Sequence, residues 1–179
     1  MKSIVVYESK YGSTERYAKW IGEELGCRVS NISEVSLEEL LTYDNIVFGG
    51  WLHAGTIKGL KKISDNIEKF KNKNLTVFYV GLSIIDNTDN KEYKEIKEKN
   101  FKDMKDINTF YLRGAFNYQK LNFVDKIMMT IFKFMLKKQK KEEMDDNTKG
   151  MLDAYDNPVD FVNKESIKPI IESLNTMKL

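Results

Sequence analysis

Hydroxyl side chains gather around a single glycine close to the start of the chain. The segment reads Ser9-Lys10-Tyr11-Gly12-Ser13-Thr14. Hydroxyl groups and backbone N–H groups donate hydrogen bonds to phosphate oxygens, and a glycine lets the backbone approach a ligand closely. When a helix follows, its first turn adds unpaired N–H groups and the positive end of the helix dipole. These residue types in this order predict a binding site for a phosphate monoester.

The flanking residues supply the elements that would position this segment. Ser3–Tyr7 is an apolar, β-branched run typical of a buried strand. Glu15–Leu25 carries apolar residues at helical spacing, which predicts an amphipathic helix. An alternative is that Ser13 or Thr14 merely caps this helix. The segment is neither a P-loop nor a dinucleotide fingerprint, because it lacks the Gly-Lys-Thr/Ser ending and has one glycine rather than three.

Strand and helix patterns continue to alternate along the chain. Further strands are expected at Cys27–Ile32, Asn45–Gly50, Leu75–Gly81 and Asn108–Ala115. Helices are expected at Leu37–Leu41, with Ser36 as its cap, and at Ile57–Phe70, Glu92–Phe101 and Asp160–Leu174. Alternation of this kind predicts an α/β fold whose parallel sheet is covered on both faces. Ligands of such sheets bind at the carboxyl ends of the strands, so the loops Ser9–Thr14, Trp51–Thr56 and Leu82–Asn90 should converge.

The composition limits the classes of function. The chain has 179 residues, which favours one domain over residues 1–179, and a net charge of +2, which gives no strong field for nucleic acid. Cys27 and His53 are the single cysteine and histidine, so we expect no metal site built from these residue types. No signal-peptide pattern opens the sequence and no apolar run is long enough to span a bilayer. We therefore expect a cytoplasmic protein.

Three stretches carry a resemblance to a known family beyond the first loop. They are Gly49–Gly55, Arg113–Tyr118 and Phe123–Met129. With the hydroxyl-rich loop, they resemble the flavodoxin-like FMN proteins, and most closely the menaquinone-dependent protoporphyrinogen IX dehydrogenase family. The resemblance implies a flavodoxin-like three-layer sandwich with a five-stranded parallel sheet in the order 2-1-3-4-5. It also implies a helical insertion at about 119–155, between the last strand and the last helix.

The resemblance implies FMN as the cofactor. Its phosphate would bind at the first loop, and its ring system would lie between the loops that follow the third and fourth strands. The cofactor-binding residues are then Ser9, Lys10, Tyr11, Gly12, Ser13, Thr14, Trp51, Leu52, His53, Ala54, Gly55, Leu82, Ser83, Ile84 and Asn87. Trp51 either stacks on the flavin or packs under a loop. His53 either bonds the flavin or is an ordinary surface histidine, and no residue stands out as a catalytic acid or base.

Three functions remain open at this stage. The first is an oxidoreductase that transfers electrons from protoporphyrinogen IX to menaquinone in heme biosynthesis. The second is a flavodoxin-type carrier between protein partners, which the near-neutral charge and pI of about 8.4 disfavour. The third is a binding module that has the fold without the flavin. The partners would accordingly be a porphyrinogen or quinone, or a redox protein.

The expected insertion contains an apolar helical pattern with lysines beside it. Leu121–Lys141 holds Val124, Ile127, Met128 and Ile131 at helical spacing. One interpretation is an interfacial helix that makes peripheral contact with a membrane on its inner face. A second is a methionine-rich wall for a large apolar substrate. The third is a helix folded over the edge of the sheet.

Overall fold

The computed structural model describes residues 1–85, 91–104, 107–138 and 144–176. The chain divides into two compact units. The first unit comprises Met1–Gly81, Ile85–Leu112 and Val162–Leu179, and the second comprises Leu82–Ile84 and Arg113–Phe161. The expected insertion at 119–155 falls within the second unit.

The first unit is built on a sheet in the order β2-β1-β3-β5-β6. These strands are β1 (Ser3–Tyr7), β2 (Arg28–Asn31), β3 (Asn45–His53), β5 (Asn74–Gly81) and β6 (Asn108–Arg113). The pairs β1–β2, β1–β3 and β3–β5 are parallel. The expected strand order is thereby confirmed, since these are the five predicted strands taken in sequence. A short additional strand, β4 (Thr56–Ile57), pairs antiparallel with β3.

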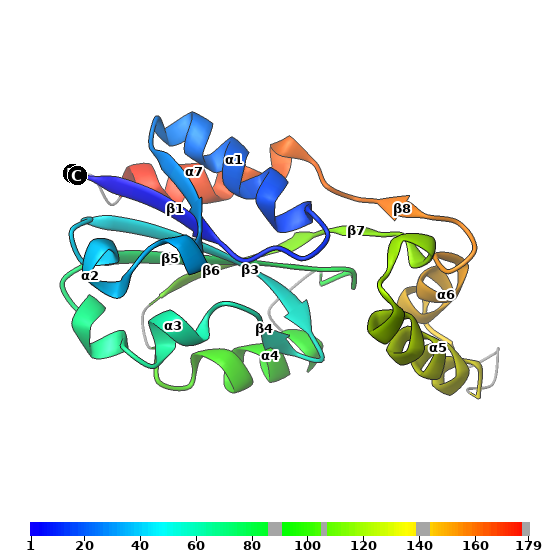
Figure 1. The fold of residues 1–179 in the computed structure, drawn as a ribbon. Coiled ribbons are helices and arrows are strands. Elements are labelled where there is room, and N and C mark those ends of the chain that lie inside the picture. The colour runs from blue at the N-terminus through cyan, green and yellow to red at the C-terminus, as the bar shows by residue number, and fades with distance from the viewer. Residues whose placement is uncertain (86–90, 105–106, 139–143, 177–179) are drawn as a thin grey trace. The chain divides into compact units, whose positions relative to one another are not determined.

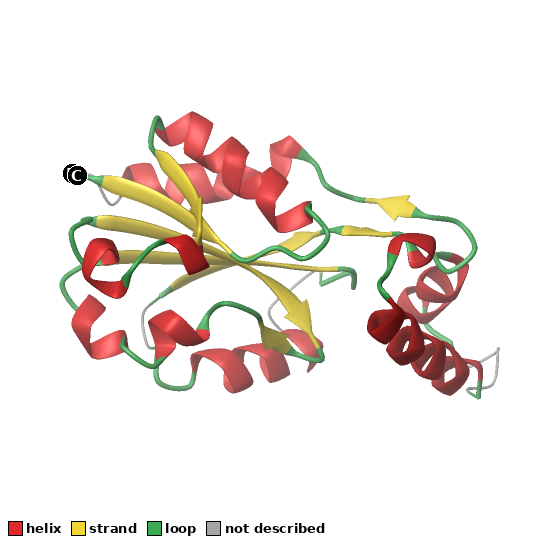
Figure 2. Ribbon diagram, in the orientation of Figure 1, coloured by secondary structure: helices red, strands yellow, loops and turns green. Residues whose placement is uncertain are grey.

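Helices cover both faces of this sheet (Figures 1 and 2). On one face lie α1 (Ser13–Leu25) and α7 (Lys168–Thr176), which follows the 3₁₀ turn η5 (Lys164–Ile167). On the other lie α2 (Leu37–Leu40), α3 (Lys61–Ser64), the 3₁₀ turn η2 (Ile67–Phe70) and α4 (Lys91–Phe101). A further 3₁₀ turn, η1 (Ile32–Glu34), follows β2. The expected three-layer α/β arrangement is thus present in the first unit.

Alternate strand residues build two separate cores. Ile4 and Val6 of β1 join the cluster beneath α2, α3 and α4, whereas Val5 joins the cluster beneath α1 and α7. All three side chains are fully buried. Successive side chains of a strand point to opposite faces, so a strand buried on both faces has an uninterrupted apolar sequence. This is why Ser3–Tyr7 could be recognised as a central strand.

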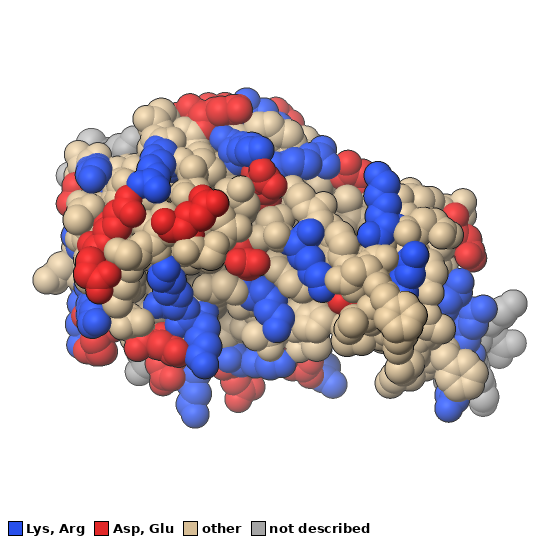
Figure 3. Space-filling model, viewed as in Figure 1, with Lys and Arg blue, Asp and Glu red and all other residues tan. Residues whose placement is uncertain are grey.

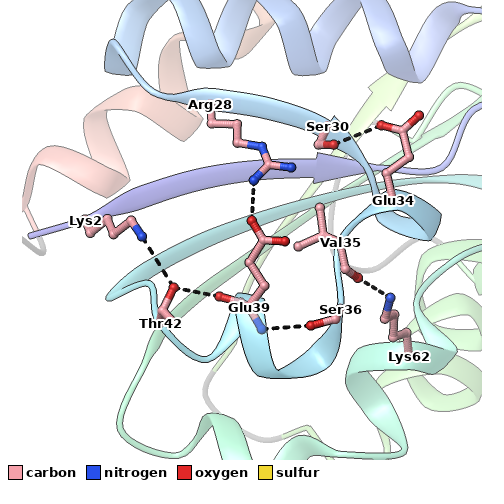
Figure 4. A network of polar contacts seen from close by, with 9 residues as sticks. All are labelled: Lys2, Arg28, Ser30, Glu34, Val35, Ser36, Glu39, Thr42 and Lys62. Carbon is pink, nitrogen blue, oxygen red and sulfur yellow. Dashed lines mark hydrogen bonds and ion pairs between the residues drawn. The ribbon is translucent and has the colours of Figure 1, made fainter.

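Polar contacts join β2 and α3 to the segment around α2 (Figure 4). Arg28 donates to the carboxylate of Glu39, and Lys62 donates to the backbone carbonyl of Val35. Ser36 caps α2, because its Oγ accepts from the backbone N–H of Glu39 at 3.0 Å. The cap expected from the sequence is therefore confirmed.

The helix expected at Ile57–Phe70 is wrong. The structure has β4, α3 and η2 in that range. Gly59 explains the break, because its φ of +83° is left-handed and does not fit a right-handed helix. A Cβ at Gly59 would lie 2.6 Å from the Cβ of Glu8, so this turn packs closely against the chain that follows β1.

The second unit has its own small core. It contains a two-stranded sheet of β7 (Ala115–Phe116) and β8 (Val159–Asp160), the turn η3 (Tyr118–Lys120), and the helices α5 (Phe123–Lys137) and α6 (Asp146–Asp153). Phe116, Ala154 and Tyr155 are its buried centre. Because Val159–Asp160 pairs with β7, the last helix cannot begin at Asp160 as expected, and helical structure starts at Lys164.

Replacing Gly49 with alanine tests the close packing of β3 against β5. A Cβ at Gly49 would lie 2.1 Å from the fully buried ring of Phe78, so Gly49→Ala should lower the free energy of unfolding by about 1–3 kcal/mol. Urea denaturation followed by circular dichroism measures this. The control is Gly150→Ala, whose Cβ meets no atom within 4 Å. This variant should leave the free energy of unfolding unchanged or raise it by up to about 1 kcal/mol. Equal stability of the two variants would contradict the packing described.

Candidate functional site

The junction between β1 and α1 is a turn whose backbone is held in place by Ser9 and Gly12. Gly12 occupies the N-cap position of α1 with a left-handed backbone, φ 92° and ψ −16°. Its N–H donates to the Oγ of Ser9 at 3.2 Å. A Cβ at Gly12 would meet no atom within 4 Å, so open space lies in front of the turn. The hydroxyl-rich segment thus forms a preorganised turn at the start of a 13-residue helix.

The start of α1 differs from that of other helices in the chain. Ser36, Asn122 and Asp145 each cap their helix by accepting a backbone N–H with a side-chain oxygen. Gly12 has no side chain to do so. The alternative that Ser13 or Thr14 caps the helix is wrong, because both residues lie inside α1. The N-cap residue therefore leaves the N–H groups of the first turn to other acceptors, which suits an anion.

The second segment expected at the site, Trp51–Gly55, forms a tight hairpin between β3 and β4. His53 pairs with Thr56, which leaves a two-residue turn of Ala54 and Gly55. Both turn residues have positive φ, 48° and 72° respectively. A two-residue turn with positive φ at both positions matches the right-handed twist of the paired strands. Gly55 adopts this conformation without strain, whereas Ala54 needs support from its surroundings.

Helix α4 supplies that support. The Nζ of Lys99 donates to the carbonyl of Ala54 at 2.7 Å. Asn100 donates through Nδ2 to the carbonyl of Gly55 at 2.8 Å, and its Oδ1 accepts from the N–H of Ile57 at 2.8 Å. Sequence reasoning missed Lys99 and Asn100. They lie more than 40 residues from the hairpin, and nothing in a polar helix distinguishes them from solvated side chains.

The first two segments meet in the structure. The Nζ of Lys10 lies 5.5 Å from the centroid of the Trp51 ring and 5.7 Å from that of Tyr11. The rings of Trp51 and His53 pack edge-on, with centroids 5.4 Å apart. Beneath them, the N–H of Glu8 donates to the carbonyl of Gly49 at 2.8 Å. The β1–α1 turn and the rings of Trp51 and His53 therefore form one cluster at the carboxyl ends of β1 and β3.

One feature of this cluster is typical of a binding site. The indole Nε1 of Trp51 is buried and has no hydrogen-bond partner among the described residues. An orphaned buried donor is unfavourable by about 1–3 kcal/mol, and native structures retain few of them.

The third expected segment belongs to the second unit. Leu82 and Ile84 are fixed there by side chains of that unit: Asn147 bonds both the N–H and the carbonyl of Ile84, at 2.8 and 3.3 Å. The Nε of Arg113 donates to the carbonyl of Leu82 at 3.4 Å. Ser83 lies between them, and Asn87 lies outside the described residues. The assignment of Leu82, Ser83, Ile84 and Asn87 to the flavin site stays a prediction.

Comparison with known families identifies the fold. A family model described as a flavodoxin domain matches residues 4–143, well over half of the chain. The chain belongs to the flavodoxin domain family. Members of this family are typically flavoproteins. The narrower resemblance to protoporphyrinogen IX dehydrogenases has no counterpart among these matches.

Individual relatives of this flavodoxin domain are more distant. An uncharacterized protein of Methanocaldococcus jannaschii is 36% identical over 80 residues, which are 44% of this chain and 53% of that protein. The chain therefore spans about half the length of this curated relative. Among solved structures, a flavodoxin from the domain Archaea is 20% identical with a TM-score of 0.45, covering 63% of this chain and 83% of that one. Flavodoxin 2 of Bacillus cereus is 22% identical with a TM-score of 0.42, covering 63% and 86%.

Removing the Asn100 side chain tests how the hairpin is held. Asn100→Ala removes the acceptor for the Ile57 N–H, so hydrogen exchange of that amide should accelerate by about tenfold, the equivalent of one lost hydrogen bond of about 1–1.5 kcal/mol. Amide exchange followed by NMR measures this. The control is Asn66→Ala, which removes an amide that donates to Lys62 and should leave Ile57 unchanged. Unaltered exchange at Ile57 in Asn100→Ala would mean that the β3–β4 hairpin is stable without the Asn100 side chain, which would contradict its support by α4.

Proposed function

We propose that the chain binds FMN at the cluster formed by the β1–α1 turn and the β3–β4 hairpin, and acts as a redox protein. The observation that carries the proposal is the glycine N-cap of α1 in a member of the flavodoxin domain family. When bound, FMN supplies hydride or electron transfer. The protein residues then have the tasks of anchoring the phosphate, holding the ring system and limiting its contact with water.

The roles of the residues follow from their positions. The backbone N–H groups in the first turn of α1 would bind phosphate oxygens in the open space beside Gly12, with the dipole of α1 favouring the negative charge. The ammonium of Lys10, between the Tyr11 and Trp51 rings, would add positive charge. The hairpin held by Asn100 would flank the ring system, with the Trp51 indole N–H as an available donor.

The more specific proposal is an FMN-dependent oxidoreductase of the protoporphyrinogen IX dehydrogenase type, with menaquinone as acceptor. Two features support it over a carrier between proteins. The chain is close to neutral rather than acidic, at a net charge of +2. The second unit also carries large exposed apolar side chains on α5, and these suit an apolar substrate or a lipid phase better than a soluble acidic partner.

A carboxylate placed at the start of α1 tests the phosphate site. Ser13→Asp should weaken FMN binding by about 10- to 100-fold, because it repels the phosphate and competes for charge-assisted hydrogen bonds worth about 1.5–3 kcal/mol. Riboflavin has no phosphate, so its affinity should change little. Quenching of flavin fluorescence on titration of the apo-protein gives both dissociation constants.

The matched control is Ser36→Asp, which adds the same charge at the start of α2 and keeps a capping side chain. It should leave both affinities unchanged. If Ser13→Asp weakened FMN and riboflavin equally, the phosphate would not lie at this turn. If the wild-type chain bound neither flavin, the proposed function itself would be wrong.

Turnover distinguishes the two redox functions. The flavin-loaded protein should oxidise protoporphyrinogen IX with a soluble menaquinone analogue as acceptor, and Ser13→Asp should lose this activity in proportion to its lost FMN. Absorbance of the porphyrin product measures the rate. A protein that binds FMN tightly and exchanges electrons with a flavodoxin reductase, yet forms no porphyrin above the flavin-only control, would be a carrier.

A further inference from the structure

Large exposed apolar side chains are concentrated on one helix. Eleven such residues occur in the described part of the chain, and eight of them lie on α5. Their exposed fractions reach 77% at Phe123 and 63% at Phe134. The full set on α5 is Phe123, Val124, Ile127, Met128, Ile131, Phe132, Phe134 and Met135. At 3.6 residues per turn these positions cover about half of the helix circumference.

The opposite side of α5 already has partners within the second unit. Asp125 is buried, and Met129 packs against the cluster around Tyr155. The Tyr155 hydroxyl donates to the carbonyl of Met129 at 2.6 Å, and Lys133 lies 3.4 Å from the carboxylate of Asp156. These contacts fix the orientation of α5 on its own unit. The exposed apolar face is therefore not the side on which the helix folds.

The charged residues that α5 itself adds to this surface have one sign, and Lys133 among them is paired with the exposed carboxylate of Asp156. The sequence of α5 carries Lys126, Lys133 and Lys137 along one flank, and Lys138 follows at its C-cap. Its single acidic residue, Asp125, is buried on the inner side. Figure 3 shows the same combination, with tan surface over α5 and blue lysine side chains beside it. No carboxylate of α5 reaches the exposed surface.

We propose that α5 docks the protein flat on the surface of an anionic lipid bilayer. A helix with one broad apolar face and lysines at its border lies in the headgroup region, with the apolar face toward the acyl chains and the lysines on the lipid phosphates. At 15 residues α5 is about 22 Å long, and no helix in the described residues is long and apolar enough to cross a membrane. The proposal does not depend on flavin binding.

A second copy of the chain fits this face less well. In an antiparallel pair, two α5 helices packed face to face would bring their lysine flanks together, and neither helix offers an exposed carboxylate to pair with them. Helix pairs also bury a narrow seam, whereas this face covers about half of the circumference. An anionic bilayer matches both the width of the apolar face and the sign of its border.

Vesicle flotation of the full chain tests the docking. The wild-type protein should float with vesicles of phosphatidylcholine and phosphatidylglycerol in equal amounts, and much less with phosphatidylcholine alone. Ile131→Glu with Phe134→Glu should reduce the bound fraction at least tenfold, because two exposed apolar side chains of this face are replaced by carboxylates. Lys137→Gln with Lys138→Gln should weaken binding by about fivefold per lysine on the anionic vesicles only.

A matched control distinguishes the loss of the apolar face from the change in net charge. Lys61→Gln with Lys71→Gln makes the same change of net charge as the double glutamate variant, at exposed positions of the first unit, and should bind like the wild type. Far-UV circular dichroism of each variant checks folding, which should be retained because all six positions are solvent-exposed. Sedimentation velocity without lipid gives the oligomeric state. A dimer that the double glutamate variant dissociates, with no flotation of the wild type, would overturn the proposal in favour of self-association.

Discussion

The left-handed backbone of Gly12 is the constraint on which the site depends. It lets the chain leave β1, turn within a few residues and enter α1 with no capping side chain on the N-cap residue. The Ser9 hydroxyl holds this turn by accepting the N–H of Gly12, and the interior position of β1 between β2 and β3 fixes its location. A residue with a Cβ would be strained at this φ and would extend into the open space where we propose that the phosphate binds.

The hairpin after β3 also lies at the carboxyl ends of the strands, but different contacts stabilise it. Its two positive-φ residues are held by hydrogen bonds from α4 rather than by the hairpin alone. Lys10 then spans from the first turn to the ring of Trp51. Three separate elements of the first unit, the β1–α1 turn, the β3–β4 hairpin and α4, thus hold the site in place. Each of these elements has its own core contacts behind it.

Local patterns were sufficient to predict the sheet and the first turn, and insufficient elsewhere. The apolar runs of β1, β3 and β5 are nearly continuous because both faces are buried, so the positions of these strands could be expected from the sequence. Their order was implied by the resemblance to flavodoxin-like proteins. The prediction of a long helix at Ile57–Phe70 was wrong because Gly59 has a left-handed backbone. A single glycine within a helical pattern does not indicate this conformation. Asn100 could not have been found, because its role arises from contacts between residues more than 40 positions apart.

The most direct measurement is an NMR titration of the isotope-labelled apo-protein with FMN, recording the amide resonances of the β1–α1 turn. The account predicts that amide protons in the first turn of α1, at residues 13–15, shift downfield as FMN is added because they donate to its phosphate, and that riboflavin leaves them nearly unchanged. Resonances of this turn that stay in place while FMN binds, or identical shifts with FMN and riboflavin, would contradict the assignment of the phosphate to the start of α1.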